Sequence, residues 1–306
     1  MRVFLTGASG YLGSVLIDHL ARLPEIENIT GIALTSPKSP WPAKTRFVQM
    51  DIRSPGLAAL MAGHDAVIHA ACVVLWPATM PAAERDDINR NGTRNVAQAA
   101  LANQVRRFIH ASSMAVYDPT LARGASAIPE DFPLGTGNSP YYYWNSKAAA
   151  EQLVSGTFAS SSTLLTLFRP IYIIGPRNRA LVTSYRRNAI NFAGRNPRRQ
   201  FIHEDDVAAA FVQALFTEMP GAFNVVPDDF IRLRDVWKIV GARFVPTAPL
   251  WLASRIAALK WKFLGSPIHP SWIEDMLMDI TGSNAQLKRT GWKPRYGSAD
   301  ALSSAV

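Results

Sequence analysis

Short runs of apolar, often β-branched residues alternate with longer segments over the first two thirds of the chain. Short apolar runs are typical of buried strands, and apolar residues at every third or fourth position are typical of helices. The expected strands are residues 3–6, 29–34, 46–50, 66–70, 107–111 and 163–168. The expected helices are residues 14–23, 57–62, 84–103 and 142–158. This alternation predicts an α/β fold with a doubly wound parallel sheet and right-handed crossovers.

The pattern loosens after residue 170, where prolines, arginines and tryptophans become frequent. It returns briefly, with a helix expected at 205–216 and a strand at 222–226. We therefore expect a sheet domain over residues 1–170 that is completed by about residues 201–230. The remainder of 171–306 should form a smaller, mostly helical substrate-binding part, interleaved with that domain at its C-terminal side.

Composition narrows the class of protein. With 306 residues, 48% of them hydrophobic, the chain can bury one large core or two modest ones. The single cysteine, Cys72, excludes an intramolecular disulfide and fits a reducing compartment. No apolar run is long enough to span a bilayer or to act as a signal peptide, so no membrane span and a cytoplasmic location are expected.

The formal charge of +9 raises the question of nucleic-acid binding. The basic residues are mostly scattered, and neither zinc-finger spacing nor a basic helix with interleaved aromatics is present, so no nucleic-acid partner is predicted. The local clusters favour anionic small ligands instead. They comprise Arg186, Arg187, Arg195, Arg198 and Arg199.

Residues 6–13 read T-G-A-S-G-Y-L-G, between the first expected strand and the first expected helix. Glycine permits positive φ and close approach of a diphosphate, and a helix amino terminus offers N–H donors and a favourable dipole. The position of this G-x-x-G-x-x-G segment therefore predicts a dinucleotide-binding domain.

Three tyrosines precede a lysine in the segment 139–151, S-P-Y-Y-Y-W-N-S-K-A-A-A-E. On a helix, only the i,i+4 pair Tyr143 and Lys147 shares a face at close range. A phenol of pKa about 10 is a poor base at neutral pH, and a nearby cation favours its phenolate. Tyr143 is therefore the predicted proton carrier, whereas Tyr141 and Tyr142 are expected to be packing residues.

Taken together, these motifs resemble those of the extended short-chain dehydrogenase/reductase family, which includes nucleotide-sugar epimerases and carbonyl reductases. The resemblance covers residues 1 to about 226 and implies a Rossmann-type fold. It rests on the glycine loop, Asp51-Ile52-Arg53, His69-Ala70-Ala71, Asn89-Arg90-Asn91-Gly92-Thr93, Ser112-Ser113, Tyr143-x-x-x-Lys147, Arg169-Pro170 and residues 201–207, F-I-H-E-D-D-V.

The resemblance implies roles for single residues. Ser113, Tyr143 and Lys147 would form the catalytic set, with the hydroxyl of Ser113 on the reacting oxygen and Lys147 also on the nicotinamide ribose. Gly7, Gly10, Tyr11 and Leu12 would line the pyrophosphate, Asp51 and Ile52 would meet the adenine, and Ala70, Ala71 and Pro170 would complete the cofactor site. No metal site is expected.

The end of the second strand bears on the choice of cofactor. An acidic residue there would bind the ribose 2′-hydroxyl of NAD, but residues 31–38 read G-I-A-L-T-S-P-K. Thr35, Ser36 and Lys38 could instead bind a 2′-phosphate, although the arginine that many NADP-binding relatives place here is missing. NADP is therefore preferred and NAD remains the alternative.

The predicted enzyme is an NAD(P)-dependent oxidoreductase that reduces a small-molecule ketone or aldehyde, or oxidises the secondary alcohol. Dehydratases of the family carry Asp-Glu after the catalytic hydroxyl residue, where this chain has Met114 and Ala115. Tyr172 stands where epimerases commonly carry Asn. A nucleotide-sugar epimerase with tightly bound NAD and a non-catalytic cofactor-binding protein remain the alternatives.

Relatives of this family often form homodimers by pairing the two helices that hold the regions of Asn89 and Tyr143. A homodimer is therefore expected, with small residues in these helices providing the close contact. They are Ala97, Ala99, Ala100, Ala148, Ala149 and Ala150.

Overall fold

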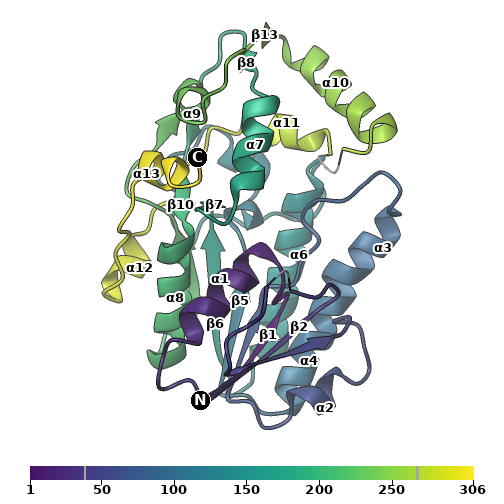
Figure 1. The fold of residues 1–306 in the computed structure, drawn as a ribbon, viewed down its shortest axis with the longest axis vertical. Coiled ribbons are helices and arrows are strands. Elements are labelled where there is room, and N and C mark those ends of the chain that lie inside the picture. Colours follow the sequence, from purple (N-terminus) through teal and green to yellow (C-terminus); the bar gives the residue numbers. More distant parts are fainter. Residues whose placement is uncertain (38, 267–268) are drawn as a thin grey trace.

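A seven-stranded parallel sheet forms the centre of the protein (Figure 1). The computed structural model describes residues 1–37, 39–266 and 269–306. The strand order is β11-β6-β5-β4-β1-β2-β3, and every neighbouring pair is parallel. The strands are β1 (Arg2–Thr6), β2 (Asn28–Ala33), β3 (Thr45–Gln49), β4 (Ala66–His69), β5 (Arg107–Ala111), β6 (Leu164–Pro170) and β11 (Gly221–Val225). The predicted doubly wound parallel sheet is confirmed.

Helices cover both faces of this sheet. On one face lie α1 (Tyr11–Leu20) and α8 (Glu204–Phe216), which pack against each other. On the other face lie α2 (Leu57–Met61), α4 (Thr93–Ala102) and α6 (Tyr142–Phe158). Strands buried on both sides explain why their sequences read as continuous apolar runs.

The prediction of a single helix over residues 84–103 is wrong in detail. The chain forms α3 (Ala82–Asp86), then a π-helical turn (Asp87–Gly92), and only then α4. Asn89, in the π turn, bonds the loop after β4: its Oδ1 accepts from Val73 N at 2.7 Å and its Nδ2 donates to Val73 O at 3.0 Å. A π turn often marks a functional site, and here it aims an amide at that loop.

The C-terminal part has a hydrophobic core of its own, centred on residues such as Phe192, Phe201, Trp237 and Leu302. Its helices are α7 (Arg179–Arg187), α9 (Leu233–Ile239), α10 (Leu250–Phe263), α11 (Ser271–Asp275) and α13 (Ser298–Ser303). Three strand pairs tie it together: β7 (Tyr172–Ile174) with β10 (Phe201–His203), β9 (Arg198–Arg199) with β12 (Ile231–Arg232), and β8 (Asn191–Phe192) with β13 (Thr247–Ala248). The domain division given above stays a prediction.

Three short elements lie outside these groups. A 3₁₀ turn (Met114–Val116) and α5 (Pro119–Ala122) follow β5, and α12 (Ala285–Arg289) packs against β11. Within the described ranges, no helix has both the length and the apolar character needed to cross a membrane.

Candidate active site

The predicted cofactor residues lie at one edge of the sheet. Because all seven strands are parallel, their carboxyl ends meet there, where open α/β sheets bind their ligands. They are Gly7, Gly10, Tyr11 and Leu12 after β1, Thr35 and Ser36 after β2, Asp51 and Ile52 after β3, Ala70 and Ala71 after β4, and Pro170 at the end of β6.

The glycine loop is built for close backbone approach. Gly7 has φ +69°, and a Cβ there would lie 2.7 Å from Ala71 N. A Cβ on Gly13 would lie 2.2 Å from Gly7 O. Gly10 N donates to Gly7 O at 2.9 Å, and α1 begins at Tyr11. Backbone packed this tightly leaves no room for side chains, so the loop offers the small-residue cradle before a helix that a diphosphate requires.

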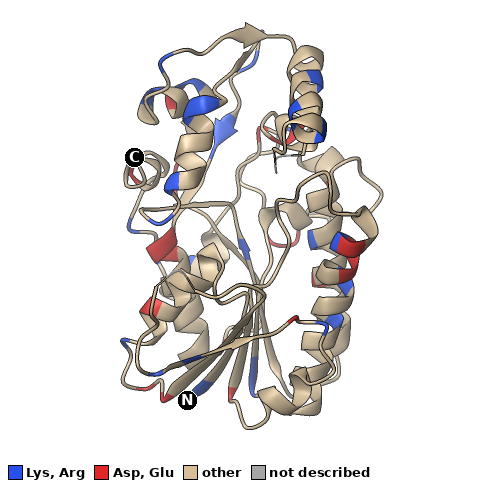
Figure 2. Cartoon of the chain, turned by 45° about the vertical axis from the view of Figure 1, so that its right-hand side comes forward, with Lys and Arg blue, Asp and Glu red and all other residues tan. Residues whose placement is uncertain are grey.

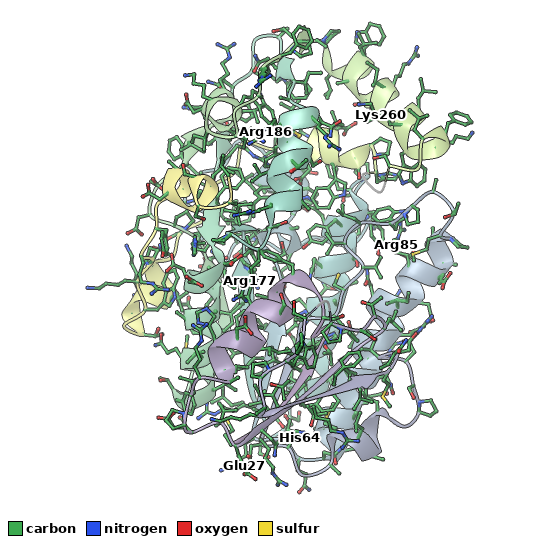
Figure 3. The ribbon with its side chains drawn as sticks, viewed as in Figure 1. Glu27, His64, Arg85, Arg177, Arg186 and Lys260 are labelled. Atoms are coloured by element: carbon green, nitrogen blue, oxygen red, sulfur yellow. The ribbon has the colours of Figure 1, made fainter. Side chains whose placement is uncertain are left out.

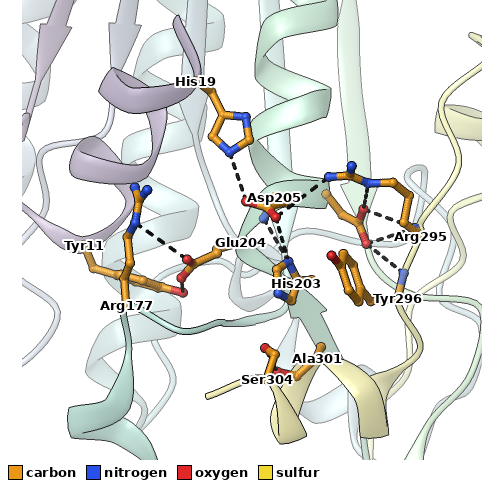
Figure 4. Close-up of polar contacts among 11 residues, drawn as sticks. Tyr11, His19, Arg177, His203, Glu204, Asp205, Arg295, Tyr296, Ala301 and Ser304 are labelled. Carbon is orange, nitrogen blue, oxygen red and sulfur yellow. Dashed lines mark hydrogen bonds and ion pairs between the residues drawn. The ribbon is translucent and has the colours of Figure 1, made fainter. Parts of the chain in front are cut away.

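The side chain of Tyr11 reaches the amino terminus of α8 (Figure 4). Its hydroxyl donates to Glu204 Oε2 at 2.6 Å, while Arg177 lies 3.9 Å from Glu204 and 2.7 Å from Asp18. Burial and this bond raise the pKa of Tyr11. Glu204 was not singled out from the sequence, although it stands within the quoted segment 201–207. It connects the glycine loop to the C-terminal part.

The three tyrosines have three different environments. The hydroxyl of Tyr141 accepts from Arg123 at 2.6 Å. The hydroxyl of Tyr142 accepts from Asn89 Nδ2 at 2.7 Å. Of the three, Tyr143 alone has Lys147 near its ring face, with Nζ 5.9 Å from the ring centroid. The structure therefore separates the tyrosines as the i,i+4 argument predicts.

Two side chains lie beside Tyr143: Lys147, one turn along α6, and Ser113, which follows β5. Lys147 is 6% exposed, and its Nζ donates to Ala111 O at 2.9 Å, at the end of β5. Ser113 follows two residues later and caps the 3₁₀ turn, where its Oγ accepts from Ala115 N at 3.1 Å. A buried ammonium, a phenol and a hydroxyl are thus brought together at the carboxyl end of β5.

Burial and neighbouring groups compete in setting the pKa values of Tyr143 and Lys147. Burial raises the pKa of Tyr143, against the opposing effects of the Lys147 charge and of a hydrogen bond with Ser113. The lowering expected from the lysine alone is therefore outweighed. For Lys147, burial acts to lower the pKa, but Cys72, Tyr143 and Glu151 raise it and prevail. The charge of Lys147 thus favours the Tyr143 phenolate, which can accept a proton, while burial favours the neutral phenol, which can donate one.

Ser112 points away from this group. Its Oγ donates to Glu151, whose carboxylate forms an ion pair with Arg169. The two charged side chains are 1% and 5% exposed. This buried pair fixes α6 to β6 and so sets the position of Tyr143 and Lys147 along the sheet edge.

Helix α11 covers Tyr143, which the sequence did not predict. Trp272 lies over the phenol with ring centroids 5.2 Å apart. Asp275 accepts from Trp144 Nε1 at 2.8 Å and also from the Tyr172 hydroxyl. Residue 272 lies 129 positions after Tyr143 by subtraction of their numbers, and no local sequence signal connects the two.

At the end of β2, Thr35 Oγ1 lies 3.1 Å from Ser9 Oγ of the glycine loop. Thr35 and Ser36 are exposed. Lys38, the third residue expected to bind a 2′-phosphate, lies outside the described residues.

The two residues expected to meet the adenine have partners within the chain. The carboxylate of Asp51 bonds Arg53, and these hydrogen bonds hold the pKa of Asp51 below its usual range. Ile52 is 6% exposed and packs closely against Gly92 of the π turn. Contact of either residue with adenine stays a prediction.

Much of the basic cluster at 186–199 has partners within the chain as well. Arg186 Nε donates to Val240 O at 2.6 Å, and Arg198 pairs with Asp279 at 2.9 Å. Arg199 is 4% exposed and donates to backbone carbonyls at the end of α11. Contacts within the chain thus account for these three arginines without an anionic ligand.

Comparison with known proteins places the chain in a family. The sequence profile of the NAD dependent epimerase/dehydratase family matches residues 3–225. The chain belongs to this family, which confirms the resemblance drawn from its motifs.

Individual relatives are more distant. An uncharacterised protein of Mycobacterium bovis is 26% identical over 98% of this chain and 82% of its own. The UDP-glucose 4-epimerase of Mycolicibacterium smegmatis is 26% identical over 100% of this chain and 97% of its own. Among solved structures, MoeE5 in complex with UDP-glucuronic acid and NAD superposes with a TM-score of 0.77 at 19% identity, covering 99% of this chain and 97% of that one.

Proposed function

We propose that this protein is an NAD-dependent epimerase that acts on a nucleotide-linked sugar. The proposal rests on the buried Lys147 ammonium beside the Tyr143 phenol. The phenol also bonds Ser113, at the sheet edge that carries the glycine loop. Family membership supports this assignment. So do the names of its relatives, which include a UDP-glucose 4-epimerase and a protein with a bound UDP-sugar.

The glycine loop fits a dinucleotide. The positive φ of Gly7 and the contact of its backbone with Ala71 leave a cradle that a Cβ would fill, in front of the amino terminus of α1. Gly7, Gly10 and the backbone of Tyr11 would hold the diphosphate, and Lys147 would hold the nicotinamide ribose. When bound, the dinucleotide supplies a hydride acceptor and donor.

Side chains of the protein carry out the proton transfer. Tyr143 takes the hydroxyl proton of the sugar on its Oη while the substrate is oxidised, and returns it when the ketone is reduced. Lys147 stabilises the phenolate before the proton is taken and after it is returned, which offsets the effect of burial on the Tyr143 pKa. Ser113 donates a hydrogen bond to the reacting oxygen. Trp272 excludes water from the phenol by covering its ring.

NAD is proposed as the cofactor in place of the NADP preferred from the sequence. The bound cofactor named for the MoeE5 complex is NAD, and nothing in the comparisons favours NADP. Thr35, after β2, bonds Ser9 of the glycine loop and offers a neutral hydroxyl. Calorimetric titration with both cofactors checks this: tighter binding of NADP would overturn it.

The ketone or aldehyde reductase favoured from the sequence becomes the second candidate. Tyr172 argued against an epimerase because it replaces a sugar-binding Asn, but in the structure its hydroxyl is engaged by Asp275. The absence of Asn at this position is therefore weaker evidence against an epimerase than the sequence suggested. The expected homodimer also stays a proposal, and most of the alanines offered for it are buried within the chain.

Product analysis separates the candidates. The protein, supplied with NAD, is incubated with UDP-glucose, UDP-glucuronic acid and UDP-N-acetylglucosamine in turn, and the products are separated by chromatography. An epimerase converts one of them to its epimer with no net change in reduced-nicotinamide absorbance. Steady formation of reduced cofactor without an epimer would instead establish a dehydrogenase.

A further inference from the structure

Helix α10 presents a stripe of large apolar side chains to solvent. Its four members recur at steps of four, three and four residues, which places them on one face of the 14-residue helix. They are Leu252, Ile256, Leu259 and Phe263, with exposed fractions of 37%, 44%, 57% and 67%. Isolated exposed apolar residues are ordinary on protein surfaces, whereas a continuous stripe marks an interaction surface.

Residues outside the stripe already make the contacts that hold α10 to the protein. Ala253 is 5% exposed and belongs to the core of the C-terminal part. Trp261 Nε1 donates to Trp76 O at 3.2 Å, and the Trp76 ring lies 4.7 Å from that of Tyr142. The exposed stripe is thus not needed to hold the helix in place. The helix itself is anchored close to the candidate active site.

Basic side chains border the stripe on both sides. On a helical projection, Arg255 and Lys262 fall on one flank of the stripe and Lys260 on the other. Residues 250–264 contain no aspartate or glutamate. Figure 2 shows basic and no acidic positions along α10. Lys260, labelled in Figure 3, also donates to Asn188 Oδ1 at 3.2 Å. Trp251, 61% exposed, stands beside the basic flank.

We propose that α10 docks this protein on an anionic lipid bilayer, lying in the plane of the interface. An apolar stripe flanked by cations, with a tryptophan at the boundary, matches a headgroup region in both hydrophobicity and charge. A second copy fits less well. A two-fold contact would bring the same three cations face to face, and α10 carries no carboxylate to pair with them.

Flotation with lipid vesicles tests the proposal. The wild-type protein should float with vesicles that contain about one third anionic lipid, and salt should weaken this binding. Vesicles of zwitterionic lipid alone should bind it at least about tenfold more weakly, because each of three cations contributes roughly a fivefold increase in partitioning.

Two pairs of variants provide matched controls. Leu259→Glu should lower vesicle binding by about tenfold or more, because it buries a carboxylate in the interface. Leu121→Glu makes the same change at a leucine that is also 57% exposed, on α5, and should leave binding unchanged. Lys262→Gln should weaken binding, while Lys238→Gln, an equal loss of charge on α9, should not.

Three results would overturn the proposal. The first is no flotation of the wild-type protein with anionic vesicles. The second is equal binding by Leu259→Glu and Leu121→Glu when both variants melt as the wild type does. The third is a wild-type dimer that Leu259→Glu converts to a monomer while vesicle binding is unaffected, since the stripe would then be an interface between copies.

Discussion

Lys147 keeps a positive charge where almost no water reaches it, since its side chain is 6% exposed and neighbouring acids raise its pKa. Its Nζ bonds the carbonyl of Ala111 and faces Tyr143. One ammonium would therefore serve the phenol and the ribose of the cofactor together.

Lys147→Met keeps much of the volume and removes the charge. We expect turnover to fall by about 10²-fold or more, because the phenolate loses its counter-ion. NAD binding should weaken in parallel, as measured by calorimetry. Lys44→Met, which removes a lysine bonded only to the carbonyl of Leu23 among described contacts, serves as the control and should change neither quantity. Unaltered NAD affinity in Lys147→Met would show that Lys147 does not bind the ribose of the cofactor.

At the scale of elements, the position of α6 depends on a buried ion pair. Glu151 on α6 and Arg169 on β6 are almost fully buried, and Arg169 also donates to the Tyr117 hydroxyl. Removing one partner of such a pair leaves an uncompensated charge in the interior.

Arg169→Met should therefore lower the free energy of unfolding by about 3–5 kcal/mol. The double variant Arg169→Met with Glu151→Leu should regain a large part of that loss, because no unpaired charge remains. Urea unfolding of the wild type, both single variants and the double variant measures the coupling. Strictly additive losses would show that the two side chains do not depend on each other.

Much of the element order could be predicted from the sequence, for a physical reason. Strands buried on both faces must be apolar runs. Gly7 must be small because the backbone of Ala71 lies against it, and Gly13 because it lies against the backbone of Gly7. The spacing of Tyr143 and Lys147 likewise follows from helix geometry alone.

Other features depend on contacts between distant segments and left no local signal. The π turn at Asn89 forms because its amide bonds the backbone of Val73, in another loop. The cover of Tyr143 by Trp272 brings together a residue from the middle of the chain and one near its carboxyl end. The sign of the Tyr143 pKa shift also needed the structure, because it depends on how deeply the phenol is buried.

At the scale of the whole molecule, two stacked and buried histidines predict that the fold loses stability in acid. His69 and His110 lie on neighbouring strands with ring centroids 5.2 Å apart. Burial lowers the pKa of His69 to about 3 and holds that of His110 well below its usual value. Among the residues described, neither ring nitrogen of His110 has a hydrogen-bond partner.

Both groups are neutral in the folded protein, whereas they titrate near pH 6.5 when the chain is unfolded. As the pH falls below about 6.5, the unfolded chain gains protons that the native state does not, so stability falls by about 1.4 kcal/mol per pH unit for each histidine. His110→Phe removes one of these groups without losing a hydrogen bond.

Unfolding in urea at about pH 7 and about pH 4.5 should therefore show a smaller loss of stability for His110→Phe than for the wild type. The two proteins should differ little at the higher pH. An equal loss in both would mean that His110 is not responsible for the acid sensitivity.

A series of phenylalanine variants tests whether Tyr143, and neither Tyr141 nor Tyr142, carries the proton. Turnover of the nucleotide sugar identified by product analysis is measured for Tyr141→Phe, Tyr142→Phe and Tyr143→Phe. Tyr143→Phe should fold and bind NAD yet lose about 10²–10⁴-fold in turnover, while the other two stay within a few-fold of the wild type. An inactive Tyr142→Phe with an active Tyr143→Phe would contradict the account.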